Sequence, residues 1–263
     1  REAVGCENRA AEPFQHAGPV QRSSLRPREE NKMKNRITIE GRDGAIGAYI
    51  SRPNVSPAPA VLVLHEVFGV NADIRKTCDE LAEHGFVAVA PDLFWRQEPG
   101  VDLSVTSPAD WEHGLRLYQA YDRDLGAKDV KDAANAVAQL PETNGNVAVM
   151  GYCLGGLMAF ITAVRYGADA TVVYHGGDTE KYLGELNGFD SPLLMHLAEE
   201  DEFIPKQAQA EIKAAFAGKR KATIYSYPGQ HHAFSRHGGA HYDPASAKLA
   251  NGRTRAFLKE ALQ

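Results

Sequence analysis

The sequence predicts an α/β fold in which a mostly parallel central sheet carries helices on both faces. Short apolar runs alternate with longer segments whose apolar residues recur at helical spacing, as in parallel-sheet proteins. Residues 60–64 and 86–90 contain no polar side chain, which is typical of strands buried on both faces. The β-branched run 147–150 leads directly into a glycine-rich turn, residues 151–156. These features predict one α/β domain without an internal repeat.

The N-terminal part of the chain divides at about residue 33. Residues 1–32 are rich in charge, Pro and Ser and have little apolar periodicity, so we expect a disordered extension followed by a single domain, residues 33–263. Residues 36–40 and 45–50 alternate apolar and polar side chains around a glycine-containing turn, which predicts an N-terminal hairpin.

The remaining elements follow from the spacing of apolar residues. Asn71 can cap a helix whose apolar stripe includes Cys78, so this cysteine is expected in the core. The other expected elements are a loop at 91–97 that continues into polar sequence, helices around 130–140, 154–164, 208–216 and 245–262, and strands at 170–174, 193–197 and 222–227.

Composition narrows the classes of function. The net charge of −5 suggests no nucleic-acid or membrane-surface partner, and no apolar run approaches the roughly 18 residues that span a bilayer. The three cysteines form neither a disulfide framework nor a C-x-x-C site. We therefore expect a cytoplasmic protein, a monomer, that acts on a small molecule.

The turn after residues 147–150 reads Gly151-Tyr152-Cys153-Leu154-Gly155 and is followed by an apolar helical run. A G-x-C-x-G sequence between a strand and a helix indicates the nucleophile elbow of the α/β-hydrolase fold, with sulfur in place of the usual serine oxygen. A Cβ atom at Gly151 or Gly155 would collide with the neighbouring backbone. The helix N-terminus after Cys153 favours a thiolate, so Cys153 is predicted to be a nucleophile rather than a buried structural cysteine.

A nucleophile on an elbow needs a histidine and an acid, which follow it in the order acid, then histidine. Asp201 and His232 each come just after a predicted strand, where open parallel sheets place their functional groups. His231 competes with His232, and Asp201 has three acidic neighbours, Glu199, Glu200 and Glu202. Histidines also gather at positions 231, 232, 237 and 241, but no matching carboxylate or cysteine cluster accompanies them. We therefore expect no metal and no organic cofactor.

The turn that ends the strand at 60–64 is the second informative segment. This fold places its second oxyanion donor there, so the backbone N–H of Val67 is expected to act together with that of Leu154. Glu66 is an ionisable group in a turn predicted to be buried. The alternative for Glu66 is an ordinary salt-bridged surface residue.

Several blocks in this order resemble the dienelactone hydrolases (carboxymethylenebutenolidases), and the resemblance covers residues 33–263. The blocks are residues 66–71, 91–97, 151–156, 201–205 and 232–236. The resemblance implies a Cys153–His232–Asp201 triad, which selects His232 over His231. It also implies that Glu66 engages the resting thiol and helps to generate the thiolate when substrate arrives.

The same resemblance implies a binding site for the substrate. Arg96 and Arg236 match two arginines that bind the carboxylate of the substrate, and Tyr174 matches a tyrosine of the pocket. His65 stands where the best-known members have Gln, which affects how the neighbouring glutamate is held. Trp95 also differs from those members and is expected to line the pocket.

The expected reaction is hydrolysis of a small lactone or enol ester, of the dienelactone-to-maleylacetate type, through an acyl-cysteine. The substrate is expected to carry a carboxylate. A broad carboxylesterase is the alternative within the same reaction class. A non-catalytic ligand-binding protein on the same fold is the alternative outside it.

Overall fold

The computed structural model describes Asn35–Gln263, and the extension expected over residues 1–32 lies outside this part of the chain. Its strands are β1 (Arg36–Gly41), β2 (Gly44–Ser51), β3 (Ala58–Leu64), β4 (Val87–Pro91), β5 (Thr143–Tyr152), β6 (Ala170–Tyr174), β7 (Leu193–Ala198) and β8 (Ala222–Tyr227). Its helices are α2 (Ala72–Glu83), α3 (Pro108–Ala120), α4 (Arg123–Ala138), α5 (Leu154–Tyr166), the 3₁₀ helix η1 (Thr179–Glu185), α6 (Lys206–Ala215) and α7 (Pro244–Ala261).

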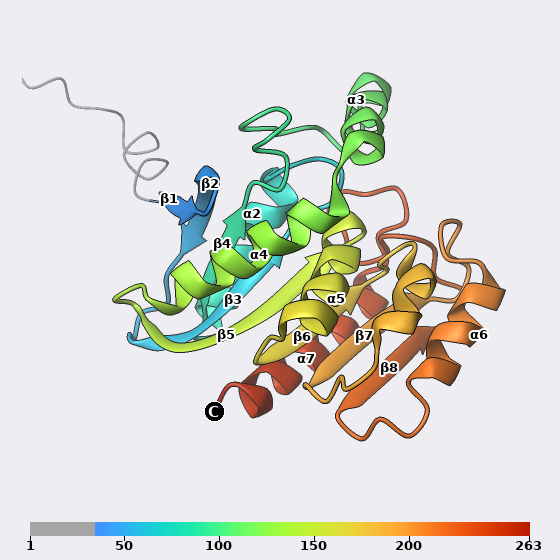
Figure 1. Ribbon diagram of the computed structural model, residues 1–263. Helices are drawn as coiled ribbons and strands as arrows, with labels where there is room; N and C mark the ends of the chain where they lie inside the picture. Colours follow the sequence, from blue (N-terminus) through green and yellow to red (C-terminus); the bar gives the residue numbers. More distant parts are fainter. Residues whose placement is uncertain (1–34) are drawn as a thin grey trace, which may run out of the picture. The chain divides into compact units, whose positions relative to one another are not determined.

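The eight strands form one sheet in the order β1-β2-β4-β3-β5-β6-β7-β8 (Figure 1). From β4 to β8 along this order all neighbours pair in parallel, whereas β1 with β2 and β2 with β4 pair antiparallel. The mostly parallel sheet and the N-terminal hairpin expected from the sequence are confirmed. This architecture is that of the α/β-hydrolase fold.

Helices cover both faces of the sheet, and alternate residues of β3 show how the core divides. Leu62 belongs to the cluster packed under α4, α5 and α6, whereas Val61 belongs to the cluster under α2 and α7. Figure 1 shows α4, α5 and α6 in front of the sheet and α7 behind it. Cys78 is fully buried in the second cluster, as its helical spacing predicted. None of the helices within residues 35–263 combines the length and the apolar character needed to cross a membrane.

Helix α3 was not expected, because its segment reads as polar sequence with few apolar positions. Pro108 occupies its first turn, and the Ser107 hydroxyl accepts a hydrogen bond from the Asp110 amide at 3.3 Å. A Cβ atom at Gly114 would stand 2.5 Å from the carbonyl oxygen of Val67. The glycine therefore lets α3 pack directly on the turn after β3, where an oxyanion donor was expected.

Candidate active site

Cys153 occupies a sharp turn between β5 and α5. Its φ of 51° and ψ of −114° lie where L-residues other than glycine are rarely found, so the surrounding turn must hold it there. A Cβ atom at Gly151 would run into the carbonyl of Gly155, and one at Gly155 would run into the carbonyl of Leu64. The Cys153 amide donates to the carbonyl of Tyr174 at 3.1 Å, which ties the turn to β6. The turn thus has the geometry expected of an elbow.

His232 and Asp201 meet at the ends of the last two strands. The Nδ1 atom of His232 lies 2.9 and 3.0 Å from the two carboxylate oxygens of Asp201, and both side chains are buried. The Phe203 amide donates to the same carboxylate at 2.9 Å and fixes its orientation. His231 turns instead to Glu202, with 2.6 Å between Nδ1 and the carboxylate, and remains exposed. The structure therefore brings together Asp201 and His232, the pair that the family resemblance implied.

The pKa of His232 also depends on the charge of Cys153. Burial lowers the pKa of His232, but the negative charge of Cys153 and the hydrogen bond that His232 donates to Asp201 outweigh burial and raise the pKa to about 10. A weak interaction with the Cys153 thiol also raises the pKa of His232, but its geometry falls short of a hydrogen bond, so the buried Nε2 atom has no well-formed hydrogen bond among the described residues. Thiol and imidazole are thus neighbours that are not yet joined by a well-aligned hydrogen bond, as is common before substrate binds.

Glu66 is buried, and its carboxylate is held by Arg236. Nε and Nη2 of Arg236 donate to the two carboxylate oxygens at 2.6 and 2.8 Å. The guanidinium also lies over the rings of Phe68 and Trp111, 5.0 and 5.5 Å from their centroids. Among the described residues Arg236 is the hydrogen-bond partner found for the Glu66 carboxylate, so the expectation that Glu66 engages the resting thiol stays a prediction. The alternative of a surface salt bridge is wrong, because the pair is buried.

Arg236 nevertheless remains close to the nucleophile. Burial lowers the pKa of Arg236, but the charge and hydrogen bonds of Glu66, followed by the charges of Cys153 and Asp73, raise it above its ordinary value. The positive charge of Arg236 therefore interacts with Cys153 even while it is paired with a carboxylate.

His65 holds the backbone of the turn that contains Glu66. Its Nε2 accepts from the Leu93 amide at 2.9 Å, so Nδ1 carries the proton and donates to the Glu66 carbonyl at 2.6 Å. The amides of Val67 and Leu154 make no hydrogen bond with other described residues, as two oxyanion donors require. His65 therefore braces the main chain, whereas the carboxylate of Glu66 is held separately.

Arg96 and Trp95 belong to a different network. Arg96 donates to Asp129 at 2.8 and 2.7 Å and to Asp43 at 2.6 Å, and it stacks on Trp95. The indole of Trp95 donates to Asp129 at 3.0 Å and packs against Gly44 in the β1–β2 turn. Two protein carboxylates on β1–β2 and α4 are thus the partners of Arg96, so its expected pairing with Arg236 around a substrate carboxylate stays a prediction. Trp95 lines a cavity together with Val70 and Val101.

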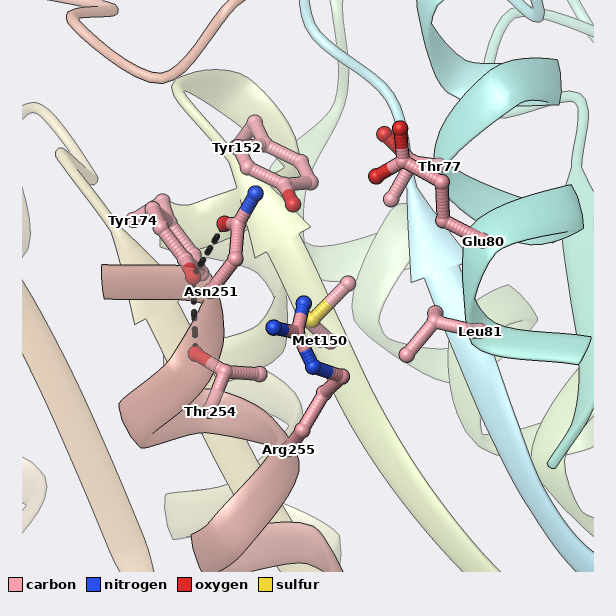
Figure 2. A pocket seen from close by; sticks show the side chains of 9 residues that line it. All are labelled: Thr77, Glu80, Leu81, Met150, Tyr152, Tyr174, Asn251, Thr254 and Arg255. Atoms are coloured by element: carbon pink, nitrogen blue, oxygen red, sulfur yellow. Dashed lines mark hydrogen bonds between the residues drawn. The ribbon is translucent and has the colours of Figure 1, made fainter. Parts of the chain in front are cut away.

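The side chain of Tyr174 packs on the face of the sheet that α7 covers, which differs from the substrate-binding position expected for it. Its hydroxyl bonds to Asn251 at 2.9 Å and to Thr254 at 2.7 Å, both on α7 (Figure 2). Figure 2 shows its ring beside Tyr152 in a small pocket between α2 and α7. The hydroxyl is thus used to attach α7, which corrects the expectation of a substrate-binding tyrosine. The residue contributes to the elbow through its carbonyl, which accepts from Cys153.

Several residues near the site were not identified from the sequence. His175 directly follows β6, is fully buried, and lies edge-on to His232 with 4.6 Å between ring centroids. Burial and the charge of His232 hold the pKa of His175 well below its ordinary value. Phe203 contacts the other side of His232 at 4.7 Å. Asp201 and His232 were predicted because each follows a strand, and His175 also follows a strand. The same argument could therefore have identified His175 from the sequence.

Helix α3 contributes aromatic side chains that were not predicted from the sequence. Trp111 lies beside Arg236, and the Tyr118 hydroxyl donates to Asp178 at 3.2 Å. Burial raises the pKa of Tyr118, and the charge of Cys153 adds a smaller contribution. Arg123 lies over the Tyr118 ring at 4.8 Å. These residues were missed because their segment was interpreted as a loop.

Two groups of side chains among residues 35–263 have the donor types and spacing of metal ligands. One is buried and consists of Glu66, His175 and His232, with ligand atoms within 4.8 Å of one another. The other is exposed and consists of Glu202, His231 and His241. His237, the remaining member of the predicted histidine cluster, pairs instead with Asp73 at 2.9 Å.

Comparisons with known proteins agree with this geometry. The family model described as "Dienelactone hydrolase family" matches residues 46–262. The chain belongs to this family. A protein of Azospirillum brasilense assigned as a carboxymethylenebutenolidase is 40% identical over 223 residues, which cover 84% of this chain and 96% of the relative. The carboxymethylenebutenolidase of Pseudomonas putida is 35% identical, with 84% and 94% covered.

A solved structure shows the same fold. A dienelactone hydrolase-like promiscuous phosphotriesterase from metagenomic libraries superimposes with a TM-score of 0.73 at 20% identity, and covers 87% of this chain and 98% of its own. Family membership makes this dienelactone hydrolase-family protein a carboxylic ester hydrolase.

Proposed function

We propose that this hydrolase opens a small lactone or enol ester of the dienelactone type, yielding a product of the maleylacetate type, through an acyl-cysteine on a Cys153–His232–Asp201 triad. The observation that carries the proposal is the strained Cys153 beside a buried His232 whose Nδ1 is bound to Asp201. Relatives named carboxymethylenebutenolidase at 34–40% identity support the substrate class.

The reaction follows from the positions of these groups. The Cys153 thiolate adds to the lactone carbonyl, and the amides of Val67 and Leu154 receive the developing oxyanion, each typically worth about 2.7–4 kcal/mol. The ring oxygen leaves as an enolate, which is a good leaving group and needs little help from an acid. His232 then takes a proton from water, which attacks the acyl-cysteine and regenerates the thiolate. Asp201 holds the imidazole in the required tautomer throughout.

Arg236 is the group we assign to the substrate carboxylate. It is the arginine beside Cys153, and its fork already binds one carboxylate, that of Glu66. A substrate carboxylate would compete with Glu66 for this fork. The displaced Glu66 would then be free to take the proton of Cys153, which places its role in thiolate formation after substrate binding rather than in the resting enzyme.

The pairing of Arg96 with two carboxylates of the protein favours one alternative function, that of a broad carboxylesterase. Only one of the two arginines expected to hold a carboxylate has an electrostatic interaction with Cys153, namely Arg236, whereas Arg96 is paired with Asp43 and Asp129. A single charge-assisted contact typically contributes about 1.5–3 kcal/mol, or roughly ten- to a hundredfold in kcat/KM. The ratio of kcat/KM for 4-carboxymethylenebutenolide over p-nitrophenyl acetate separates the two functions. A ratio near one would favour the carboxylesterase, and Arg96→Ala should leave the ratio unchanged.

The covalent step is tested with Cys153→Ala, which should lower kcat by at least about 10⁴-fold. Iodoacetamide should label Cys153 far faster than Cys78, whose thiol is buried and has a raised pKa. A burst of product equal to one enzyme equivalent would exclude a non-catalytic ligand-binding protein. Turnover retained by the alanine variant would refute the acyl-cysteine.

A further inference from the structure

His175 is a buried histidine whose ring nitrogens have no partner. Its side chain is fully buried, and neither Nδ1 nor Nε2 makes a hydrogen bond with the described residues. Burying a polar group without a partner costs free energy, so such groups are uncommon and call for an explanation. The triad does not supply one, because His232 uses Asp201 rather than His175.

The missing partner is explained by what surrounds the ring. One nitrogen of His175, one nitrogen of His232 and one carboxylate oxygen of Glu66 all lie within 4.8 Å of one another. Two histidines and one glutamate are a set that zinc accepts in proteins, at roughly 2.0–2.2 Å from each ligand. Tetrahedral ligands at that range are roughly 3.4 Å apart. The three side chains therefore need only small movements to enclose one ion.

The outer contacts of this cluster also suit a metal. Asp201 binds Nδ1 of His232, which leaves Nε2 as the atom directed away from the carboxylate and without a partner. A carboxylate behind a histidine in this way is a common outer contact of zinc ligands, because it fixes the orientation of the ring. Arg236 similarly fixes the carboxylate of Glu66, although its positive charge opposes a cation and weakens binding.

We propose that Glu66, His175 and His232 form a reversible Zn²⁺ site. Cys153 lies outside the group whose ligand atoms are within 4.8 Å of one another, and it completes the site as a fourth ligand by moving its sulfur toward the ion. Zinc held there occupies the nitrogen of His232 and the sulfur that the proposed hydrolysis requires. It acts as an inhibitor of the enzyme rather than as a cofactor. Binding of the ion does not depend on the proposed function, whereas inhibition rests on it.

The test uses the full chain, freed of metal by a chelator that is then removed. Zinc chloride alone is titrated in a calorimeter, and alkylation of Cys153 by iodoacetamide is followed at each zinc concentration. We expect one ion per chain, with slower alkylation and slower hydrolysis over the same concentration range. Cobalt(II) should give a thiolate charge-transfer band in the wild type that Cys153→Ser lacks.

Two matched variants locate the ion. His175→Phe keeps an aromatic ring against His232 but removes a ligand, and should weaken zinc binding at least about tenfold. His231→Phe removes a ligand from the exposed group with Glu202 and His241, and should leave the buried site unchanged. If His175→Phe does not fold, as judged by circular dichroism, His175→Gln replaces it.

The outcomes distinguish the two proposals. No zinc binding by the wild type, or binding lost in His231→Phe but kept in the His175 variant, overturns the site. Zinc binding that protects Cys153 in an enzyme unable to hydrolyse any lactone or ester supports the site and refutes the proposed function.

Discussion

The buried pair between Glu66 and Arg236 gives a prediction whose size can be worked out. Their side chains are 4% and 8% exposed, and two hydrogen bonds of 2.6 and 2.8 Å join them. Glu66→Gln removes the negative charge and leaves a buried guanidinium over two aromatic rings. Breaking such a pair from one side typically costs about 3–5 kcal/mol, because the remaining charge stays buried without compensation.

In a protein of this size, each kcal/mol corresponds to roughly 2–4 °C in Tm, so Glu66→Gln should melt about 6–20 °C below the wild type. Arg236→Met should cost a similar amount. The double variant Glu66→Gln, Arg236→Met should be more stable than either single variant, since it leaves no unpaired buried charge. Urea unfolding at neutral pH measures all four proteins, and equal slopes would show that the denatured states are comparable.

This experiment also separates stability from activity. If Glu66 acts on the thiol as proposed, the double variant should recover stability while its kcat stays low. Single variants that cost less than about 1 kcal/mol would behave like a surface pair, and additive costs in the double variant would show no coupling. Either result would refute the argument that a buried, mutually dependent ion pair holds Glu66 at rest.

Two further predictions concern the elbow and its histidine. NMR titration should place the pKa of His232 near about 10, and Cys153→Ala should lower it, because the charge of Cys153 is the largest of the influences that raise it. Since the raised pKa favours the protonated folded state, unfolding free energy should fall as pH rises from 6.5 to about 10, less steeply in Cys153→Ala. Separately, Gly155→Ala places a Cβ against the carbonyl of Leu64 and should lower the free energy of unfolding by about 3 kcal/mol or more. Gly252→Ala, on α7, is the control: its Cβ meets no atom within 4 Å, and it should raise the free energy of unfolding by about 0.5–1 kcal/mol. Equal urea midpoints for the two variants would contradict the steric argument.

The parts of the site that could be predicted from the sequence share a physical origin. Cys153, Asp201 and His232 each follow a strand, and parallel strands end at one edge of a sheet, so the order of the chain is enough to bring them together. The two glycines of the elbow could be read because backbone contact leaves no alternative residue. Local rules of this kind do not depend on which loop side chains meet.

The predictions that the structure does not bear out concern side chains whose binding partners are distant in the sequence. Arg236 binds Glu66, which is 170 residues away in the sequence, and Arg96 binds Asp129 and Asp43. Both arginines nevertheless follow strands of the same sheet. Position along the chain says which end of the sheet a residue lies near, but it does not say which carboxylate is closer. The prediction for Tyr174 was wrong for a related reason. Tyr174 ends a strand, but its side chain points to the face covered by α7 rather than toward Cys153.

The charges of the site suggest why the pairing of Arg236 matters for the proposed function. In the resting state of the proposed mechanism, the charges of Glu66 and Arg236 cancel, and the triad carries one negative charge, that of Asp201, while the thiol of Cys153 keeps its proton and the imidazole of His232 is neutral. An anionic lactone would meet this negative charge unless it could reach an arginine, and the arginine beside the thiol is Arg236. In the proposed mechanism its binding displaces Glu66, and the displaced carboxylate is the group we propose to deprotonate the thiol. Neutral esters lack the carboxylate that begins this exchange, so selectivity for anionic substrates and activation of Cys153 would arise from a single event.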